Sequence, residues 1–275
     1  MGNERGRQMI NEFEQYLKEQ KLSKNTMISY MGAVKQYEVK YGKMNQKNLK
    51  AYKTYLVENY KFSTVNLKIR GINCYLESIG KSNWSLLSVK VQQKAYLENV
   101  ISEADYEYFK ACLKRDGEMF WYFVIHFLAS TGARISELLQ FKAEHVERGY
   151  IDIYSKGGKF RRIYIPDQLQ KEAMEWLVDN GRNSGFLFLN RYGERITARG
   201  IANQLKKFAE RYQINTCVVY PHSFRHRFAK SFLERYNDIA LLADLMGHEN
   251  IETTRIYLRK TSTEQRNIVN KVVDW

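Results

Sequence analysis

Five side chains of the kinds that act on phosphate esters stand in three short stretches of this sequence. Arg134 and Arg225 each lie at a predicted helix start, and an arginine can meet a phosphate with two parallel charged hydrogen bonds. His222 comes three residues before Arg225, and His248 follows a glycine corner. Tyr257 comes nine residues after His248, and its hydroxyl could act as a nucleophile. These residue types favour attack on a phosphodiester with stabilisation by arginine charges.

Other ways of cutting a phosphodiester have no motif in this sequence. There is no phosphate-binding loop of the GxxxxGK[ST] type, no Cys/His zinc spacing and no tight cluster of Asp and Glu for a two-metal nuclease. The cysteines, Cys74, Cys112 and Cys217, lie far apart, which indicates reduced packing residues of a cytosolic protein. The sequence therefore predicts an amino-acid nucleophile that works without a metal, a cofactor or ATP.

The three stretches, taken with their neighbouring residues, resemble one known family. Residues 131–138 read TGARISEL, residues 221–226 read PHSFRH, and residues 245–257 hold a Gly-His pair followed by the tyrosine. In this order and spacing they resemble the tyrosine recombinase, or phage integrase, family, and the resemblance covers about residues 102–275. Phe224 stands where leucine is commoner in the family, and we expect this change to alter packing only.

The resemblance assigns Arg134, Arg225 and His248 to the phosphate that is attacked. The two arginines would clamp the non-bridging oxygens and the histidine would donate a further hydrogen bond; loss of one such donor typically costs about 3–4 kcal/mol in rate. Glu137 follows Arg134 by one helical turn and is expected to orient it. His226, next to Arg225, is expected to support the site by packing.

The resemblance also assigns the proton transfers. Tyrosine has a pKa of about 10, so only about one in a thousand is ionised at pH 7; Tyr257 needs a base, and His222 is the family's candidate. The departing 5′-oxygen needs a proton, which by family register comes from Lys156 in a predicted hairpin turn. Lys159 lies in the same hairpin and is the alternative acid. Attack would leave a 3′-phosphotyrosine that keeps the bond energy, so rejoining needs no cofactor.

Other basic residues near these stretches are interpreted as structural or solvated. His126 lies on a nearly all-apolar predicted helix, and we expect it and His145 to be structural. Arg161 and Arg162 follow the predicted hairpin turn, and we expect them to contact the DNA backbone or solvent rather than the reacting atoms.

The elements that must position these residues are mostly helices. In residues 1–92 apolar residues recur at helical spacing, Ser23 marks a capped helix start, and residues 48–58 and 64–79 give two further helices. No proline occurs in this segment. A domain of about four helices is predicted, and the resemblance makes it the family's helical core-binding domain, a weaker match that depends on pattern and charge.

A second domain is predicted at residues 102–275, after a polar linker at residues 93–101. Residues 119–130 form a nearly all-apolar core helix, and residues 150–165 alternate around a Gly-Gly turn, which indicates a β-hairpin. Ser102 marks a helix start, residues 135–141 resume helical spacing, and further helices follow to the end of the chain, one of them at residues 251–258. The expected fold class is mainly α with a small antiparallel β-sheet, in which a helical core-binding domain and an α+β catalytic domain form a two-domain DNA clamp.

The charge of the chain indicates a nucleic-acid partner. The formal net charge is +14, and residues 1–97 hold 17 basic and 7 acidic residues, a net of +10. Binding to phosphates releases counterions, so such an excess favours DNA. An anionic membrane surface is the alternative, but it would favour one basic amphipathic helix, and here the lysines are spread out. No apolar run reaches the roughly 18 residues that span a bilayer.

By resemblance, we expect this chain to be a simple recombinase without an arm-binding domain, which acts as a homo-tetramer on two DNA sites through a Holliday junction. Integration, excision, inversion or resolution would be its role, in the cytoplasm of a bacterium or encoded by a phage or mobile element. Residues 258–275 carry Val269, Val272, Val273 and Trp275, an apolar side that a neighbouring protomer could bury by tail exchange.

Two other functions remain open at this point. A DNA-binding protein without cleavage activity would tolerate changes at the phosphate-binding positions. A relaxing topoisomerase would use the same tyrosine chemistry, and exchange of partner strands would distinguish a recombinase from it.

Overall fold

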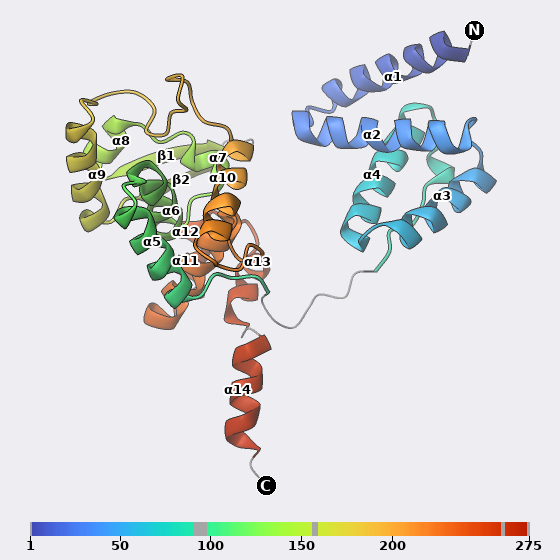
Figure 1. The fold of residues 1–275 in the computed structure, drawn as a ribbon. Helices are drawn as coiled ribbons and strands as arrows, with labels where there is room; N and C mark the ends of the chain where they lie inside the picture. Colours follow the sequence, from blue (N-terminus) through green and yellow to red (C-terminus); the bar gives the residue numbers. More distant parts are fainter. Residues whose placement is uncertain (1, 91–97, 156–158, 260–261, 274–275) are drawn as a thin grey trace. The chain divides into compact units, whose positions relative to one another are not determined.

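The computed structural model describes residues 2–90, 98–155, 159–259 and 262–273 (Figure 1). Contacts between Cα atoms divide the chain into an N-terminal unit, residues 1–93, and a C-terminal unit, residues 94–275. The division falls within the segment expected as a linker. Each unit has a hydrophobic core of its own, so each can be understood by itself.

The described part of the N-terminal unit consists of helices joined by short turns. Ser23 and Asn45 cap two of the helices, because their side chains accept the backbone N–H of Thr26 and Asn48. These caps fix where the chain turns between helices. The elements are α1 (Gly2–Glu19), α2 (Lys24–Tyr41), α3 (Gln46–Asn59), α4 (Phe62–Ser78) and the 3-10 helix η1 (Ser82–Trp84).

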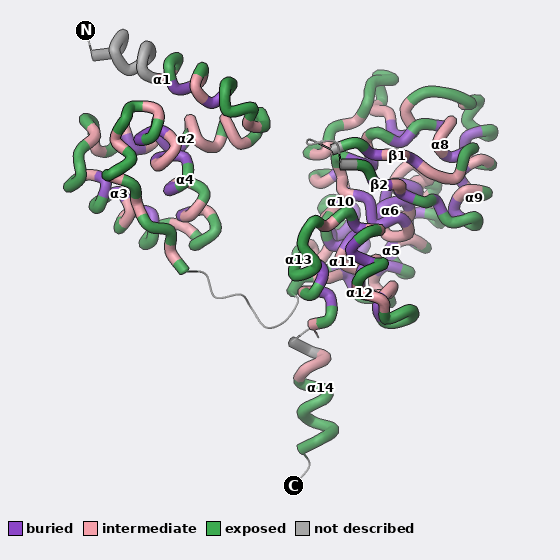
Figure 2. The backbone as a smooth tube through the Cα atoms, turned by 180° about the vertical axis from the view of Figure 1, so that it is seen from behind, coloured by how far each residue is buried: buried purple, intermediate pink, exposed green. Residues whose placement is uncertain are grey.

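The C-terminal unit is built around α6 (Met119–Thr131), a helix that is apolar on nearly all sides and largely buried. In Figure 2 the buried backbone of this unit gathers around α6 and α11 (Pro221–Tyr236). Arg134 comes shortly after the end of α6 and Arg225 lies on α11, so both arginines are anchored to this core. The other helices are α5 (Glu103–Arg115), α7 (Ile135–Leu138), α8 (Ala143–Arg148), α9 (Asp167–Asp179), α10 (Ala198–Arg211), α12 (Ile239–Met246), α13 (Ile251–Arg255), the 3-10 helix η2 (Ile256–Leu258) and α14 (Ser262–Val272).

The sheet of the C-terminal unit is an antiparallel pair, β1 (Tyr150–Ser155) and β2 (Lys159–Tyr164), in which Tyr150 pairs with Tyr164. Alternate residues face opposite sides of a strand. Ile151, Ile153 and Ile163 are therefore buried on one face, whereas aromatic side chains are exposed on the other.

The predicted fold class, mainly α with a small antiparallel sheet, is confirmed. Two expected helices are shorter than predicted: α7 ends at Leu138 rather than residue 141, and the stretch 251–258 changes to a 3-10 turn after Arg255. Lys156 lies outside the described residues. In the part of the chain that the structure describes, no helix combines the length and apolar character needed to cross a membrane.

Candidate active site

Arg134 is the N-cap residue of α7, two residues after Gly132, which ends α6. The carboxylate of Glu137 accepts the backbone N–H of Arg134 at 2.6 Å and its Nη1 at 2.9 Å. The Nη2 of Arg134 also donates to the carbonyl oxygen of Gly247 at 3.4 Å. The Arg134 side chain is 37% exposed and that of Glu137 only 7%. The carboxylate thus holds the guanidinium from the protein side and leaves part of it open to an incoming group.

Arg225 lies near the start of α11 and is almost completely buried. Its guanidinium donates to the carbonyl oxygens of Gly132 and Met246, which end α6 and α12 and would otherwise lack helical partners. Gly132 has a φ of 61°, and a Cβ there would lie 2.5 Å from the Phe228 ring. Burial, and then the charge of Arg134, lower the pKa of Arg225 to about 10. Arg225 therefore stays charged at neutral pH.

His248 follows Gly247, the left-handed cap of α12. Its Nε2 lies 3.1 Å from Nη2 of Arg225, and its Nδ1 lies 2.8 Å from Oγ1 of Thr254. A guanidinium can only donate, so Nε2 accepts, and in the neutral ring Nδ1–H donates to Thr254. Burial and the charge of Arg225 lower the pKa of His248 to about 4. Its Nε2 must therefore gain a proton before it can donate to a phosphate oxygen.

Tyr257 lies in the 3-10 turn η2 and is 5% exposed, in an apolar cluster formed with α11 and α12. Its ring is nearly parallel to that of His248, with centroids 6.3 Å apart, and 5.4 Å from the ring of His226. Burial raises the pKa of Tyr257, while the positive charges of Arg225 and Arg134 oppose that rise. The hydroxyl is therefore protonated at neutral pH, and it needs a base to become a nucleophile.

His222 and His226 lie one turn apart on α11, and their rings stack with centroids 5.5 Å apart. His222 is exposed, and partial desolvation followed by the charges of Arg225 and Arg134 lowers its pKa. Burial lowers the pKa of His226 to about 4. Among the described ring contacts, His226 is the member of this pair that lies against Tyr257. Both rings are neutral at pH 7 and can accept a proton.

The expectation of a solvated Arg161 is wrong. β2 directs its side chain to the buried face of the sheet, where it is 8% exposed. Its Nη2 donates to Glu137 at 2.5 Å, and its Nη1 donates to the carbonyl oxygen of Leu245 at 2.7 Å. Strand alternation is the physical reason, because Arg161 shares its face with the buried isoleucines. Arg162 points to the other face, where it pairs with Asp152 at 2.8 Å.

One carboxylate thus stands among three guanidinium groups. Glu137 bonds to Arg134 and Arg161, and its Oε2 lies 4.0 Å from Nη1 of Arg225. A single negative charge leaves an excess of positive charge in a largely buried place. An anion such as a phosphodiester is stabilised there, and more so as it gains charge during reaction.

The structure brings together Arg134, Arg225, His248 and Tyr257 from three separated stretches of sequence, with Glu137 and His226 beside them. The candidate acid Lys156 lies outside the described residues. Sequence reasoning missed Arg161 and Thr254. Arg161 had a signal, since it alternates with buried isoleucines; Thr254 had none.

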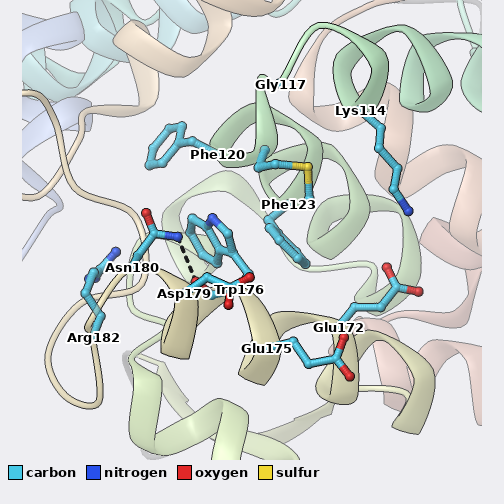
Figure 3. A pocket seen from close by; sticks show the side chains of 11 residues that line it. Lys114, Gly117, Phe120, Phe123, Glu172, Glu175, Trp176, Asp179, Asn180 and Arg182 are labelled. Carbon is cyan, nitrogen blue, oxygen red and sulfur yellow. Dashed lines mark hydrogen bonds between the residues drawn. The ribbon is translucent and has the colours of Figure 1, made fainter.

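A separate pocket of about 620 Å³ lies away from these residues, between the end of α5, the start of α6 and α9 (Figure 3). Phe120, Phe123 and Trp176 form its apolar wall, and Glu175 and Asp179 stand on the α9 side. Three carboxylates and two cations, Lys114 and Arg182, line the pocket, so it lacks the excess of positive charge found among Arg134, Arg161 and Arg225. Among the described residues, no group of three or more His, Cys, Asp or Glu side chains is placed to hold a metal ion.

This chain is similar in sequence to the phage integrase family and to individual recombinases and resolvases. Residues 99–264 match the phage integrase family. Tyrosine recombinase XerA of Pyrococcus furiosus is 27% identical over 273 residues, which cover 96% of this chain and 93% of that protein. TnP I resolvase of Bacillus thuringiensis is 28% identical over 290 residues, which cover 96% and 98%.

Among solved structures, the Tn1549 transposon integrase in complex with transposon right end DNA has a TM-score of 0.72, at 16% identity, over 96% of this chain and 99% of that chain. At this identity the likeness concerns the fold alone. The family match covers more than half of the sequence and contains all three stretches that meet in the site. This chain therefore belongs to the phage integrase family.

Proposed function

We propose that this chain is a site-specific DNA recombinase that cleaves a DNA strand with Tyr257 and rejoins it to a partner strand. The observation that carries the proposal is the buried tyrosine next to an arginine cluster with excess positive charge. Arg134 and Arg225 come from different helices and would each hold a non-bridging oxygen of the scissile phosphate. Glu137 would orient Arg134, to which it is already bonded.

The proposed reaction conserves atoms and charge at each step. The Tyr257 hydroxyl oxygen attacks phosphorus as its proton passes to His222, the base that the resemblance of the sequence assigns, and the bond from phosphorus to the 5′-oxygen breaks. The 5′-oxygen takes a proton from Lys156, an assignment that follows from the resemblance of the sequence. The product is a 3′-phosphotyrosine with a free 5′-hydroxyl. Attack by the 5′-hydroxyl of a partner strand reverses these steps and, through a Holliday junction, exchanges the strands.

The N-terminal unit is the proposed DNA-holding domain of a two-domain clamp, with residues 1–92 as that domain, 93–101 as a linker and 102–275 as the catalytic domain. Its lysines support this role, because they are spread over helices α2, α3 and α4 rather than gathered on one helix. Cytoplasmic action in a bacterium, or encoding by a phage or mobile element, completes the proposal.

A homo-tetramer on two DNA sites, with exchange of C-terminal tails between protomers, is proposed as the active assembly. The first turn of α14 contacts its own chain, because Glu264 pairs with Lys230 of α11. Beyond that turn Ile268, Val269 and Val272 are exposed, as a helix awaiting a neighbour would be. Deletion of residues 262–275 should weaken synapsis of two sites while sparing binding to one site; unchanged tetramer formation would contradict tail exchange.

A nicked suicide duplex tests the proposed function. The duplex carries a site selected by binding from random-sequence DNA, with a nick beside the cleavage position so that the cut fragment diffuses away. We expect an SDS-resistant protein–DNA adduct that is absent in Tyr257→Phe. Tyr236→Phe, at an exposed tyrosine on α11, is the matched control and should form the adduct normally.

Each competing outcome has its own meaning. A DNA-binding protein without cleavage activity would form no adduct in any variant. An adduct that persists in Tyr257→Phe would assign the nucleophile elsewhere. A relaxing topoisomerase would form the adduct and relax supercoiled DNA without exchange between two sites.

A further inference from the structure

Arg161 connects three parts of the site that are distant in sequence. It stands on β2, and its guanidinium reaches Glu137 of α7 and the carbonyl oxygen of Leu245 in α12. The side chain is 8% exposed, so neither contact is a loose surface interaction. A buried arginine with two fixed partners holds those partners in place as well.

Glu137, the first partner of Arg161, holds Arg134 in position. Oε1 of Glu137 accepts Nη1 of Arg134, and Oε2 accepts both the backbone N–H of Arg134 and Nη2 of Arg161. The two oxygens are thus divided between two guanidinium groups. Without Arg161 the Glu137 carboxylate could rotate and bond to Arg134 through both oxygens. The guanidinium of Arg134 would then be less available to bind a phosphate.

The second partner belongs to the corner that carries His248. Leu245 and Gly247 lie at the end of α12, and the carbonyl oxygen of Gly247 accepts Nη2 of Arg134. A Cβ at Gly247 would lie 2.5 Å from Cδ of Arg161. Because its guanidinium is bonded to Glu137 and Leu245, Arg161 cannot change rotamer freely. The backbone at Gly247 therefore packs directly against the Arg161 side chain.

We propose that Arg161 is a positioning residue for DNA cleavage, acting through Glu137 and the 245–247 corner to hold Arg134 where the scissile phosphate binds. The inference extends the proposed function and depends on it. Its Nη1 and Nη2 are bonded to the carbonyl oxygen of Leu245 and to Glu137, so we assign the effect of Arg161 to these two partners rather than to a contact with the phosphate. Its effect should therefore appear in the rate of cleavage rather than in the affinity for DNA.

The test measures single-turnover cleavage of the suicide duplex with protein in excess. Arg161→Met should slow cleavage by about 100-fold, the usual result of a displacement of a reacting group by about 1 Å, while the Kd for the same duplex stays unchanged. Arg161→Lys keeps the charge but cannot make both contacts, so it should recover only part of the rate. Arg182→Met is the control, since Arg182 also donates to two carbonyl oxygens, those of Leu187 and Phe186, but lines the separate pocket, and it should cleave at the wild-type rate.

A double variant separates positioning from general destabilisation. In a Glu137→Gln background the carboxylate charge is already gone and only the contact of Arg161 with Leu245 remains, so Arg161→Met should have a smaller effect than in the wild-type chain. Equal fold-losses in both backgrounds would overturn the inference, as would a wild-type rate in Arg161→Met. If Arg161→Met does not fold, a wild-type rate in Arg161→Lys overturns it in the same way. Absence of an adduct in the wild-type chain would instead count against the proposed function.

Discussion

The two units of this chain bury different kinds of side chain. The interior of the N-terminal unit holds aliphatic residues together with tyrosines such as Tyr37 and Tyr52. In the part of the chain that the structure describes, the buried polar and charged side chains all belong to the C-terminal unit: Thr131, Glu137, Arg161, Ser223, Arg225 and Thr254. Half of these six carry a formal charge, so the difference concerns charge as well as polarity.

The difference indicates that charged side chains are buried in the C-terminal unit for a reason other than stability. In the N-terminal unit the Tyr52 hydroxyl donates its one proton to Oε1 of Gln36 at 2.9 Å, with the carbonyl oxygen of Ala33 at 3.2 Å as the alternative acceptor, and among the described residues no charged side chain is fully buried with it. In the C-terminal unit Arg161 and Arg225 are buried with one carboxylate. Burying unbalanced charge costs free energy. On the proposed function, the C-terminal unit accepts that cost because the scissile phosphate would supply the missing negative charge.

If removal of a buried arginine mainly unfolds the protein, the buried charges of the C-terminal unit serve stability and the two units do not differ in this way. We expect Arg225→Met to lower single-turnover cleavage by about 100- to 1,000-fold, because a donor to the phosphate is lost. Its effect on unfolding should be smaller, about 1–3 kcal/mol for the carbonyls of Gly132 and Met246 that lose their donor. Relief of repulsion among the arginines offsets part of that loss. Cleavage assays and urea unfolding of the same variant give both numbers.

The matched control is a cation of the N-terminal unit. Lys68 donates to Gln36 at 2.8 Å and is only partly buried. Lys68→Met removes the same charge and should leave the cleavage rate unchanged at saturating protein. If the two variants lose cleavage in proportion to their loss of stability, the distinction between the units is wrong.

Much of the fold could be predicted because local signals agreed with it. Ser23 and Ser102 are the predicted caps, and both accept a backbone N–H three residues on. The alternation around residues 150–165 predicted the hairpin that β1 and β2 form. Helix ends near the site were predicted less well, since helical spacing continues to residue 141 whereas α7 ends at Leu138.

The site shows where sequence reasoning ends. Arg134, Arg225 and His248 could be selected through their neighbouring residues, but their hydrogen bonds to Gly247, Gly132 and Thr254 depend on how distant elements meet. Those acceptors are mostly backbone carbonyls at helix ends, which any residue type supplies. A pattern of side chains in the sequence therefore cannot predict these backbone acceptors.

Acid should destabilise the C-terminal unit alone in a defined pH window. All five histidines lie at residue 126 or later, and burial lowers the pKa of His126, His226 and His248 to about 4. The unfolded chain, with a histidine pKa of about 6.5, binds more protons between these values. Stability is therefore complete above pH 6.5 and is lost as the pH falls toward 4, by up to roughly 3 kcal/mol for each of these histidines.

Hydrogen exchange, corrected for its intrinsic pH dependence, would follow α4 and α6 separately across this window. We expect protection of α6 to fall between pH 6.5 and pH 4.5 and protection of α4 to stay constant, because carboxylates titrate mainly below about pH 4.5. His126→Gln should flatten the slope for α6. Parallel loss of protection in both helices would show that the histidines do not distinguish the units.

The smallest effect is expected from a polar group buried for stability alone. Tyr52→Phe removes a hydroxyl whose bonds go to Oε1 of Gln36 at 2.9 Å and the carbonyl oxygen of Ala33 at 3.2 Å. Both acceptors keep another partner, Lys68 for Gln36 and the helix for Ala33, so the N-terminal unit should lose only about 1 kcal/mol. Urea unfolding measures that loss. Cleavage at saturating protein should match the wild-type rate; a fall like that of Arg225→Met would mean that the N-terminal interior, too, is shaped by the reaction.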